Sequence, residues 1–423
     1  MKVFKFGGAS VQDIDRIKKV ATIVRENREN KLMIIVSAMG KTTNALEKVT
    51  EAFFDHNKER ALELFEIVKQ QHLTTAKYLL VTNYNVCYSQ LNDFFTEVEW
   101  LLHDTPVREY DYYYDQIVCV GELLSTCIVS NYLNEVRINT KWLDVRDYFR
   151  TDNNFRDAGI NWEQTINSIV SSIDFNSQNV YLTQGFVGAT DDNESTTLGR
   201  EGSDYSAAIF ANILNADSLT IWKDVEGVMN ADPKHFPEAQ IIKELGYDEV
   251  IEMAYYGAQV IHPKTIKPLQ NKGIDLKVKC FLDSTLPGTV ISKKKAKNLP
   301  PIYVVKQKQV LIHLASQDYS FVGDELIISL YQIFKDIKIK PNLIQTGAVS
   351  LQICVDDRTD KVELLASKAS VLFDVQIEKE LELLTIRHYN DASIHQLTSK
   401  KNILLTQKST ETFQALYRLG SSQ

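Results

Sequence analysis

The amino-acid sequence predicts an α/β fold: an open, mostly parallel sheet between helices, followed by smaller α+β units. Residues 3–38 read as strand, loop, helix and strand. The second of these strands is a continuous apolar run, which is typical of a parallel strand buried on both faces. After residue 300 the pattern changes to short alternating strands and helices. The chain has 423 residues, which is long for a single hydrophobic core, so we expect two or three domains.

Composition and charge exclude several classes of protein. Hydrophobic residues make up 44% of the chain and charged residues 24%, as in ordinary globular proteins. The formal net charge of −8 argues against a general nucleic-acid-binding protein, which usually presents a basic face. Residues 1–10 lead directly into a strand pattern without a signal peptide, and we expect no apolar run long enough to cross a membrane. We therefore expect neither a nucleic-acid partner nor a membrane partner.

The cysteines indicate a reducing compartment. Their number is odd, they are scattered, and none has the CxxC spacing of a zinc or redox site. This pattern favours reduced thiols in the cytoplasm, and no metal site is predicted. The five cysteines are Cys87, Cys119, Cys127, Cys280 and Cys354.

The first predicted strand, residues 3–6, ends in a pair of glycines. Gly7 and Gly8 stand where the strand gives way to a helix, which is predicted by apolar residues at helical spacing over residues 14–24. Glycine at such a junction exposes backbone N–H groups that bind phosphate, and Lys5 would lie beside them at the end of the strand. Structural turns use paired glycines as well, so this motif alone is weak evidence.

The second predicted strand, residues 32–38, ends in a polar loop. Gly40-Lys41-Thr42 in this loop resembles the end of a P-loop, but Ile35 stands where the first glycine of that motif is required. The sequence therefore excludes a Walker motif. A polar loop at the carboxyl end of a sheet strand is nevertheless where an α/β fold places its ligand.

The helical middle of the chain contains one buried acid. Residues 43–80 and 88–104 are predicted to be helical, and the aromatic and acidic segment 110–115 is interpreted as a packing or lid segment. Glu122 follows Gly121 in an apolar setting, and a buried glutamate needs a partner. Two interpretations stay open: a structural salt bridge, or a carboxylate that binds the ammonium group of a substrate.

The loop at residues 198–204 is the strongest single candidate for a binding site. It carries two glycines, an arginine and an acid before the apolar run 205–214, which is predicted to be a helix capped by Ser203. Arg200 offers a planar fork for a carboxylate or a phosphate, and Asp204 can hold an ammonium group or orient Arg200. With the N–H groups of a helix start, these side chains are suited to a small zwitterion beside a phosphate. The alternative is a capped helix after a glycine turn.

A further strand at residues 219–222 ends in Lys223 and Asp224, and a turn at residues 232–234 follows. An acid after a strand, followed by an Asp-Pro turn and a base, fits nucleotide and metal contacts, although such turns are common. His262 stands before a proline and is interpreted as a capping or packing histidine.

The region after residue 249 reads as a helix at 249–261, a second helix, a strand and then a linker. The lysine-rich stretch 293–297 before two prolines is the linker candidate. The elements that follow form a β-α-β-β-α-β pattern with a partial second copy. Such units typically pair by edge strands, which indicates regulation and dimerisation. The predicted strands are 310–315, 343–346, 349–355, 380–388 and 403–405, and the predicted helices are 324–334, 361–372 and 412–419.

Taken together, these motifs resemble those of the aspartate kinases of the amino acid kinase family, over nearly the whole chain. Each motif alone is modest evidence for this resemblance, but the order and spacing of all the motifs together are specific to it. The residues that carry the resemblance are Lys5-Phe6-Gly7-Gly8-Ala9-Ser10-Val11, Val36 to Asn44, Gly121-Glu122, Leu198 to Asp204, Asp224 to Gly227, Ala231-Asp232-Pro233 and Gly257 to Pro263.

The resemblance implies an amino acid kinase-like fold, with an open, mostly parallel sheet sandwiched by helices, followed by ferredoxin-like α+β ACT modules. It implies a catalytic domain at residues 1–295 and a first ACT-like regulatory domain at residues 300–378. A short second ACT-like domain would follow at residues 379–423, to which residues 302–306 would contribute a strand.

The resemblance also implies an activity and its partners. The γ-phosphoryl group of ATP, bound with Mg²⁺, would be transferred to the β-carboxylate of L-aspartate. The product, 4-phospho-L-aspartate, opens the route to lysine, methionine and threonine. A homodimer or a dimer of dimers is implied, with an effector amino acid, lysine or threonine, at the ACT modules.

Carried over position by position, the resemblance assigns the site residues. Lys5 would neutralise the transferring phosphoryl group, Asp204 would organise Lys5 and the substrate, and Arg200 would bind a carboxylate. Glu122 would bind the ammonium group. Aspartate would contact Thr43, Glu122, Arg200 and Ser203. The nucleotide would contact Lys5, Gly7, Gly8, Ser10, Lys223, Asp224, Lys234 and Gln259.

The chain departs from the family pattern at a few positions. Ala9 stands where threonine is common, and Glu201 stands where glycine is usual. Met229 and Gln259 replace a tyrosine and a lysine that contact nucleotide in some members, and residues 347–348 offer no side chain to bind an effector. Two alternatives therefore stay open. One is a different amino acid kinase, of the glutamate 5-kinase or acetylglutamate kinase type. The other is a catalytically weak amino-acid sensor on the same fold.

Overall fold

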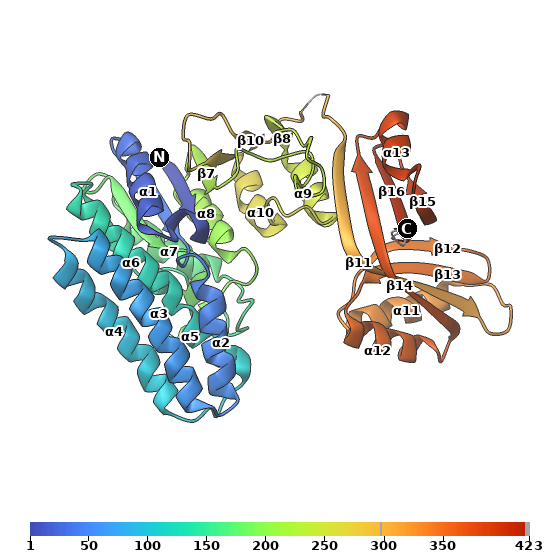
Figure 1. The fold of residues 1–423 in the computed structure, drawn as a ribbon, viewed down its shortest axis with the longest axis horizontal. Coiled ribbons are helices and arrows are strands. Elements are labelled where there is room, and N and C mark those ends of the chain that lie inside the picture. Colours follow the sequence, from blue (N-terminus) through green and yellow to red (C-terminus); the bar gives the residue numbers. More distant parts are fainter. Residues whose placement is uncertain (297, 419–423) are drawn as a thin grey trace. The chain divides into compact units, whose positions relative to one another are not determined.

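The computed structural model of the protein describes residues 1–296 and 298–418, which divide into two units (Figure 1). The first unit contains Met1–Val228, Ile241–Ile251 and Gln259–Ala296. The second contains Met229–Gln240, Glu252–Ala258 and the described residues from 298 onward. Residue 297 of the predicted linker lies outside the described residues.

An eight-stranded sheet organises the first unit, with the strand order β3-β4-β2-β1-β7-β9-β10-β8. The strands from β3 to β9 are parallel, β10 runs antiparallel to β9, and β8 is parallel to β10. The predicted mostly parallel sheet is thereby confirmed. The strands are β1 (Lys2–Phe6), β2 (Leu32–Val36), β3 (Thr140–Leu143), β4 (Val180–Gln184), β7 (Ser218–Lys223), β8 (Glu244–Gly246), β9 (Asp275–Cys280) and β10 (Thr289–Ser292).

The central strands end in register. Val36 of β2 pairs with Phe6 of β1 and with Gln184 of β4, and Phe6 also pairs with Trp222 of β7. Strand β2 is apolar throughout and fully buried, as its sequence predicts for the middle of a parallel sheet. The loops that follow these strands therefore leave the sheet along one edge.

Helices flank this sheet. Helix α8 packs on β1, β2 and β7, α6 packs on β2, β3 and β4, and α10 packs on α8. Helices α2, α3, α4 and α5 pack largely on one another. The helices are α1 (Ile14–Asn27), α2 (Thr42–Phe54), α3 (Lys58–Leu79), α4 (Tyr84–His103), α5 (Tyr110–Val118), α6 (Val120–Glu135), α7 (Trp162–Ser172), α8 (Gly202–Ile213), α9 (Tyr247–Tyr255) and α10 (Pro263–Lys272). Smaller elements are the 3₁₀ turns η1 (Gly8–Val11) and η2 (Val145–Asp147) and the hairpin of β5 (Val187–Ala189) and β6 (Ser195–Thr197).

One helical stretch, Tyr110–Glu135, has the length and the mean hydropathy, 1.3, of a membrane span, although the sequence analysis expected no run of this kind. Within its most apolar window, 83% is buried inside the protein. Core helices of globular proteins share this length and composition, so the stretch is weak evidence for a span.

The second unit is built on a six-stranded antiparallel sheet with the order β12-β13-β11-β14-β16-β15. Residues 302–306 pair with residues 383–387 at one end of the two longest strands. This α+β architecture agrees with the fold class that the sequence predicts. The elements are β11 (Ile302–Ser316), α11 (Asp324–Asp336), β12 (Pro341–Thr346), β13 (Ser350–Asp356), α12 (Thr359–Ala369), β14 (Phe373–Arg387), α13 (Asp391–Thr398), β15 (Asn402–Lys408) and β16 (Thr412–Arg418).

Two predicted helices differ from the structure. The helix predicted at 412–419 is wrong, because the described part of this segment is strand β16, which lies between β14 and β15 with residues 412–417 buried. Pairing with strands distant in sequence outweighs the local helical pattern here. The helix predicted at 249–261 ends at Tyr255, since Gly257 takes a φ of +107° that no α-helix accommodates.

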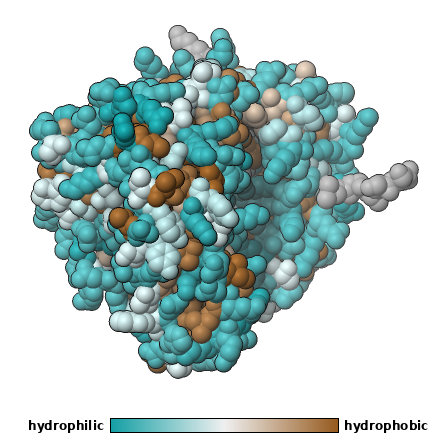
Figure 2. Space-filling view, turned by 60° about the vertical axis from the view of Figure 1, so that its left-hand side comes forward, coloured by the Kyte–Doolittle hydropathy of each residue, from teal (hydrophilic) through white to brown (hydrophobic). Residues whose placement is uncertain are grey.

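The surface is predominantly hydrophilic in Figure 2, and hydrophobic residues lie on it singly or in small groups. Among the helices of the first unit, Ile67 and Trp100 are examples, with 60% and 77% of their surface exposed. Such residues are ordinary on globular proteins.

The buried strand β2 gives a first prediction. Replacing Ile35, which is fully buried, with alanine should lower the free energy of unfolding by about 2–5 kcal/mol, because it leaves a cavity in a packed core. Urea unfolding followed by circular dichroism measures the change. The same substitution at the exposed Ile67 is the matched control and should change stability by about 0.5 kcal/mol or less. Equal losses at both positions would contradict the assignment of β2 to the core.

Candidate active site

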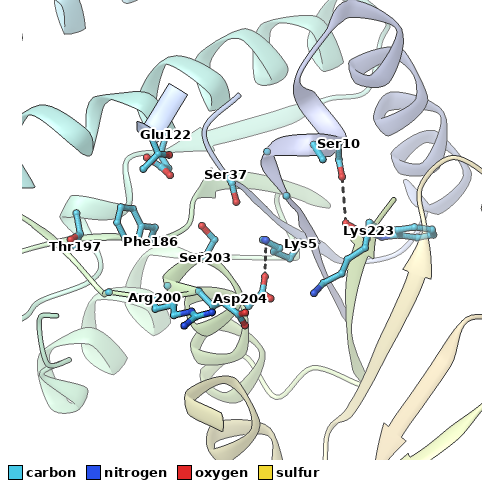
Figure 3. Close-up of a pocket in the computed structure, with 18 of the residues that line it drawn as sticks. Lys5, Ser10, Ser37, Glu122, Phe186, Thr197, Arg200, Ser203, Asp204 and Lys223 are labelled. Atoms are coloured by element: carbon cyan, nitrogen blue, oxygen red, sulfur yellow. Dashed lines mark hydrogen bonds and ion pairs between the residues drawn. The ribbon is translucent and has the colours of Figure 1, made fainter. Parts of the chain in front are cut away.

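A cavity of about 570 Å³ lies at the carboxyl ends of the central strands, in the first unit (Figure 3). The loops after β1, β2 and β7 and the first turn of α8 contribute to its wall. An α/β sheet is expected to bind ligands at this edge. The lining residues are Lys5, Gly7, Gly8, Ala9, Ser10, Ser37, Thr43, Tyr114, Glu122, Arg156, Phe186, Thr197, Gly199, Arg200, Glu201, Gly202, Ser203, Asp204, Trp222, Lys223 and Asp224.

A buried ion pair lies in the middle of this cavity. The Lys5 Nζ atom is 2.6 Å from Asp204 Oδ1, and the two side chains are only 12% and 5% exposed. Burial by itself raises the pKa of Asp204, but the ammonium groups of Lys5 and Lys223 outweigh this effect and hold that pKa below its ordinary value. Figure 3 shows the Lys5 ammonium group directed at Asp204, with Glu122 on one side of the pair and Lys223 on the other.

The glycine pair after β1 forms a backbone cradle beside this ion pair. A Cβ atom on Gly8 would lie 2.7 Å from the Ala38 carbonyl oxygen and 2.9 Å from that of Gly40, so no other residue fits there. The Gly40 N–H donates to the Gly8 carbonyl at 3.0 Å, and the Ser10 hydroxyl donates to the Trp222 carbonyl at 3.4 Å. Backbone from the loops after β1, β2 and β7 thus meets at one place, which suits an anion such as phosphate.

The loop before α8 turns sharply through two residues with positive φ. Gly199 has a φ of +76°, and Glu201, with a φ of +54°, is the N-cap of α8. The prediction that Ser203 caps this helix is wrong: no side chain forms a cap hydrogen bond here, and Ser203 lies inside the first turn. Because the left-handed residue at 201 starts the helix early, Ser203 is turned to the cavity wall instead.

Arg200 presents a free guanidinium group to the cavity. Its side chain is exposed, and it forms no hydrogen bond or ion pair with any residue that the structure describes. A planar guanidinium group in this state can bind a carboxylate through two parallel hydrogen bonds.

Glu122 is the opposite case, a buried carboxyl group with one unsatisfied oxygen. It is 3% exposed, its Oε1 atom accepts the Ala38 N–H at 3.3 Å, and its Oε2 atom has no partner among the described residues. Burial raises its pKa to about 8, against the smaller effects of the Ala38 N–H and of Lys5. The described part of the chain contains no salt-bridge partner for Glu122 within 4.0 Å, so its binding of a substrate ammonium group stays a prediction.

Most of the residues predicted from sequence come together here. Thr43 lines the cavity from the first turn of α2, and Asp224 lines it as an exposed carboxylate after β7. The Lys223 Nζ atom donates to the Val260 carbonyl at 2.7 Å. The predicted residues that line the cavity are Lys5, Gly7, Gly8, Ser10, Thr43, Glu122, Arg200, Ser203, Asp204, Lys223 and Asp224.

Two predicted nucleotide contacts do not line the cavity. Gln259 is exposed, next to the Val260 carbonyl that Lys223 binds. Lys234 belongs to the second unit, where its backbone N–H donates to Asp232 in the predicted turn. Their roles stay predictions. The interpretation of His262 as a capping residue is confirmed, because its Nδ1 atom accepts the Lys264 N–H at 3.2 Å at the start of α10.

Sequence reasoning missed one wall of the cavity. The fully buried Asp115 accepts hydrogen bonds from the Thr197 hydroxyl at 2.6 Å, the Thr197 N–H at 2.8 Å and the Arg156 N–H at 3.0 Å. The Arg156 guanidinium group stacks 4.4 Å from the centre of the Tyr114 ring. The aromatic segment 110–115 was the available signal, but only the fold brings it to the hairpin that carries Thr197.

Ser37, Phe186 and Trp222 line the cavity as well, although the sequence analysis assigned them no role. Ser37 directly follows β2, in the polar loop that the sequence did single out. Phe186 has a φ of +71°, and Trp222 stacks on Phe6 with their ring centres 6.0 Å apart. Neither feature is visible in local sequence.

The fold and the cavity together define a class of protein. A glycine cradle at the strand ends of an open α/β sheet, a buried lysine beside it and a free guanidinium group nearby are the parts of a phosphotransferase for small carboxylate molecules. The chain belongs to the amino acid kinase family, whose model matches residues 1–280.

Aspartokinases are among the relatives that match this chain. The chain is 31% identical over 373 residues to the chloroplastic aspartokinase 2 of Arabidopsis thaliana; the match covers 84% of this chain and 66%, just under two thirds, of that protein. The crystal structure of Escherichia coli aspartokinase III in complex with aspartate and ADP has a TM-score of 0.84 at 25% identity. That match covers 99% of this chain and 96% of the other. The same enzyme in complex with lysine and aspartate has a TM-score of 0.80 at 26% identity, covering 98% and 95%.

The raised pKa of Glu122 gives a prediction about stability. The folded protein keeps the Glu122 proton up to a pH of about 8, whereas the unfolded chain releases it near the ordinary value of 4.5. Between these values the folded state binds more protons, so this residue makes the free energy of unfolding fall as pH rises. Glu122→Gln removes this contribution, and the variant should gain stability relative to the natural protein from pH 5 to pH 8.

Urea unfolding at several pH values measures this difference. Glu29→Gln, at a position where the side chain is 87% exposed, is the control and should run parallel to the natural protein. A Glu122→Gln curve that also runs parallel would show that the buried carboxyl group titrates normally.

Proposed function

We propose that the protein is an aspartate kinase, which transfers the γ-phosphoryl group of ATP to the β-carboxylate of L-aspartate and yields 4-phospho-L-aspartate. One observation carries the proposal: a free guanidinium group and an unsatisfied buried carboxyl group line the same cavity as a buried lysine and a glycine cradle. An amino acid with a second carboxylate needs a guanidinium group for its α-carboxylate, a carboxyl group for its ammonium group and a lysine beside the carboxylate that accepts the phosphoryl group. The aspartokinase relatives support this reading, as does the E. coli structure that holds aspartate and ADP.

The acceptor end of the cavity would hold aspartate by its charged groups. Arg200 would bind the α-carboxylate, because its guanidinium group has no competing partner. Glu122 would bind the ammonium group, which satisfies Oε2 and favours the ionised carboxylate. Thr43 and Ser203, both on the cavity wall, would add hydrogen bonds from their hydroxyl groups. These contacts leave the β-carboxylate free to face Lys5.

The other end of the cavity would hold the nucleotide phosphates. Gly7, Gly8 and Ser10 offer the cradle, while Lys223 and Asp224 line the side beyond Lys5. Magnesium is usually bound by phosphate oxygens and one or two carboxylates, and Asp224 is a carboxylate without a hydrogen-bond or ion-pair partner among the described residues. When bound, the ion would neutralise phosphate charge.

The reaction asks the protein for alignment and charge neutralisation. The β-carboxylate is ionised at neutral pH, so no general base is needed to activate it. Lys5 would neutralise the charge that spreads over the transferring phosphoryl group, and Asp204 would hold the Lys5 ammonium group in place through the 2.6 Å ion pair. Arg200 and Glu122 would fix the distance between the acceptor oxygen and the phosphorus atom.

The second unit is proposed to be regulatory. Residues 300–378 and 379–423 would form two ACT-like modules, of which residues 419–423 lie outside the described residues. An antiparallel sheet with three helices supports this, and so does the complex of E. coli aspartokinase III with lysine. We propose that lysine or threonine binds there and that the chain forms a homodimer or a dimer of dimers. The five cysteines, all unpaired and buried, support a cytoplasmic enzyme.

Release of ADP from MgATP tests the proposed function directly. The assay compares L-aspartate, L-glutamate and no amino acid, with lysine and threonine then titrated into the active reaction. Aspartate-dependent release is the expected result. Turnover with glutamate instead would replace aspartate as the substrate, and nucleotide binding without turnover would identify an amino-acid sensor.

Lys5 gives the sharpest mutational prediction. Lys5→Ala should lower kcat by a factor of about 10²–10³, because it removes a positioned charge from the transition state. Steady-state kinetics measure the loss, and circular dichroism checks the fold. Lys2→Ala, on the same strand but outside the cavity, is the matched control and should retain kcat. A folded Lys5→Ala enzyme with a near-normal kcat would contradict the mechanism.

A further inference from the structure

Glu201 occupies a backbone position that disfavours its side chain. With φ at +54° and ψ at 28° it is left-handed, at the N-cap of α8, and it forms no side-chain cap for that helix. Glycine adopts this conformation without strain, whereas other residues lose on the order of 1 kcal/mol. A glutamate at this position therefore needs a compensating contact elsewhere.

That contact is a hydrogen bond to the start of α10. The Glu201 Oε2 atom accepts the backbone N–H of His262 at 2.8 Å. His262 is itself the N-cap of α10, and this helix packs on α8. The carboxylate thus ends at the positive end of a helix dipole, which favours its charge. This hydrogen bond joins the loop before α8, which lines the cavity, to helix α10.

The same loop also lies against Asp157, which pairs with the same helix. Lys264, in the first turn of α10, forms an ion pair with Asp157. A Cβ atom on Gly199 would lie 2.6 Å from Asp157 Oδ1, so the loop passes directly against this carboxylate. Arg200 lies between Gly199 and Glu201, and its own side chain has no hydrogen-bond or ion-pair partner among the described residues.

We propose that Glu201 is a positioning residue for Arg200, acting through its hydrogen bond to the His262 N–H. The inference rests on the proposed function, in which Arg200 binds the α-carboxylate of the acceptor. A long side chain without a partner of its own can be aimed only through its backbone. The Glu201–His262 bond holds this backbone in the orientation that directs the guanidinium group into the cavity.

The test compares two variants at one position. Glu201→Gly removes the hydrogen bond and at the same time relieves the backbone strain, so it separates positioning from stability. We expect kcat/KM for aspartate to fall about tenfold, mainly through a higher KM for aspartate, as for the loss of one hydrogen bond. The KM for ATP and the melting temperature should change little. Glu201→Gln keeps an oxygen acceptor at the same atom and should retain most of kcat/KM.

Glu380→Gly is the matched control. Glu380 also has a positive φ, +61°, but it is exposed in the second unit and its side chain forms no hydrogen bond or ion pair with the described residues. This variant should match the natural protein in kcat/KM for aspartate. A loss as large as that of Glu201→Gly would overturn the inference.

The remaining outcomes are also decisive. Glu201→Gly with unchanged kinetics would show that the hydrogen bond positions nothing. Equal losses in Glu201→Gly and Glu201→Gln would show that the negative charge is needed, which overturns a role through the hydrogen bond. The natural protein run in parallel separates the two proposals: no aspartate-dependent turnover there removes the proposed function itself, and the inference with it.

Discussion

The buried ion pair between Lys5 and Asp204 is the constraint on which the rest of the first unit depends. Two charges at 12% and 5% exposure are stable only when they meet, so the end of β1 and the first turn of α8 must lie together. Helix α8 packs on β1, and its first turn also lies close to the residue after β4: a Cβ atom on Gly185 would lie 2.7 Å from the Cα atom of Ser203. The strained turn before α8 and the glycine cradle after β1 surround the pair. The geometry of the cavity therefore depends on how the start of α8 packs on the end of β1.

Besides this ion pair, the cavity contains two ionisable groups with unsatisfied atoms. Among the described residues, the exposed Arg200 side chain has no hydrogen-bond or ion-pair partner, and the buried Oε2 atom of Glu122 has none either, while burial raises the pKa of Glu122 to about 8. Unpaired polar groups weaken a fold, so their presence in one cavity marks a site that a ligand completes. We propose that these two groups select the ligand: a carboxylate for Arg200 and an ammonium for Glu122.

The second unit follows a different structural rule. Strands β11 and β14 run for 15 residues each. They pair with each other, β11 also pairs with β13, and β14 also pairs with β16, so only the edge strands β12 and β15 do not pair with them. Two hydrophobic clusters with helices α11, α12 and α13 pack against the two ends of this pair. The two clusters therefore share the same two strands, whose pairing is interrupted by register shifts between Lys306 and Leu311. Such a framework is suited to transmit the binding of an effector, as we propose for this unit.

The sequence by itself determined the features that depend on neighbours along the chain. The buried strand at 32–36, the glycine pair after β1, the polar loops at the strand ends and the capping role of His262 follow from local composition and spacing. Only the tertiary structure decided that Ser203 does not cap α8, that the Glu122 Oε2 atom has no partner among the described residues, that Asp115 binds Thr197 in the cavity wall, and that residues 412–418 are a strand. These outcomes depend on partners far away in the sequence, and the energy of such contacts outweighs local preference.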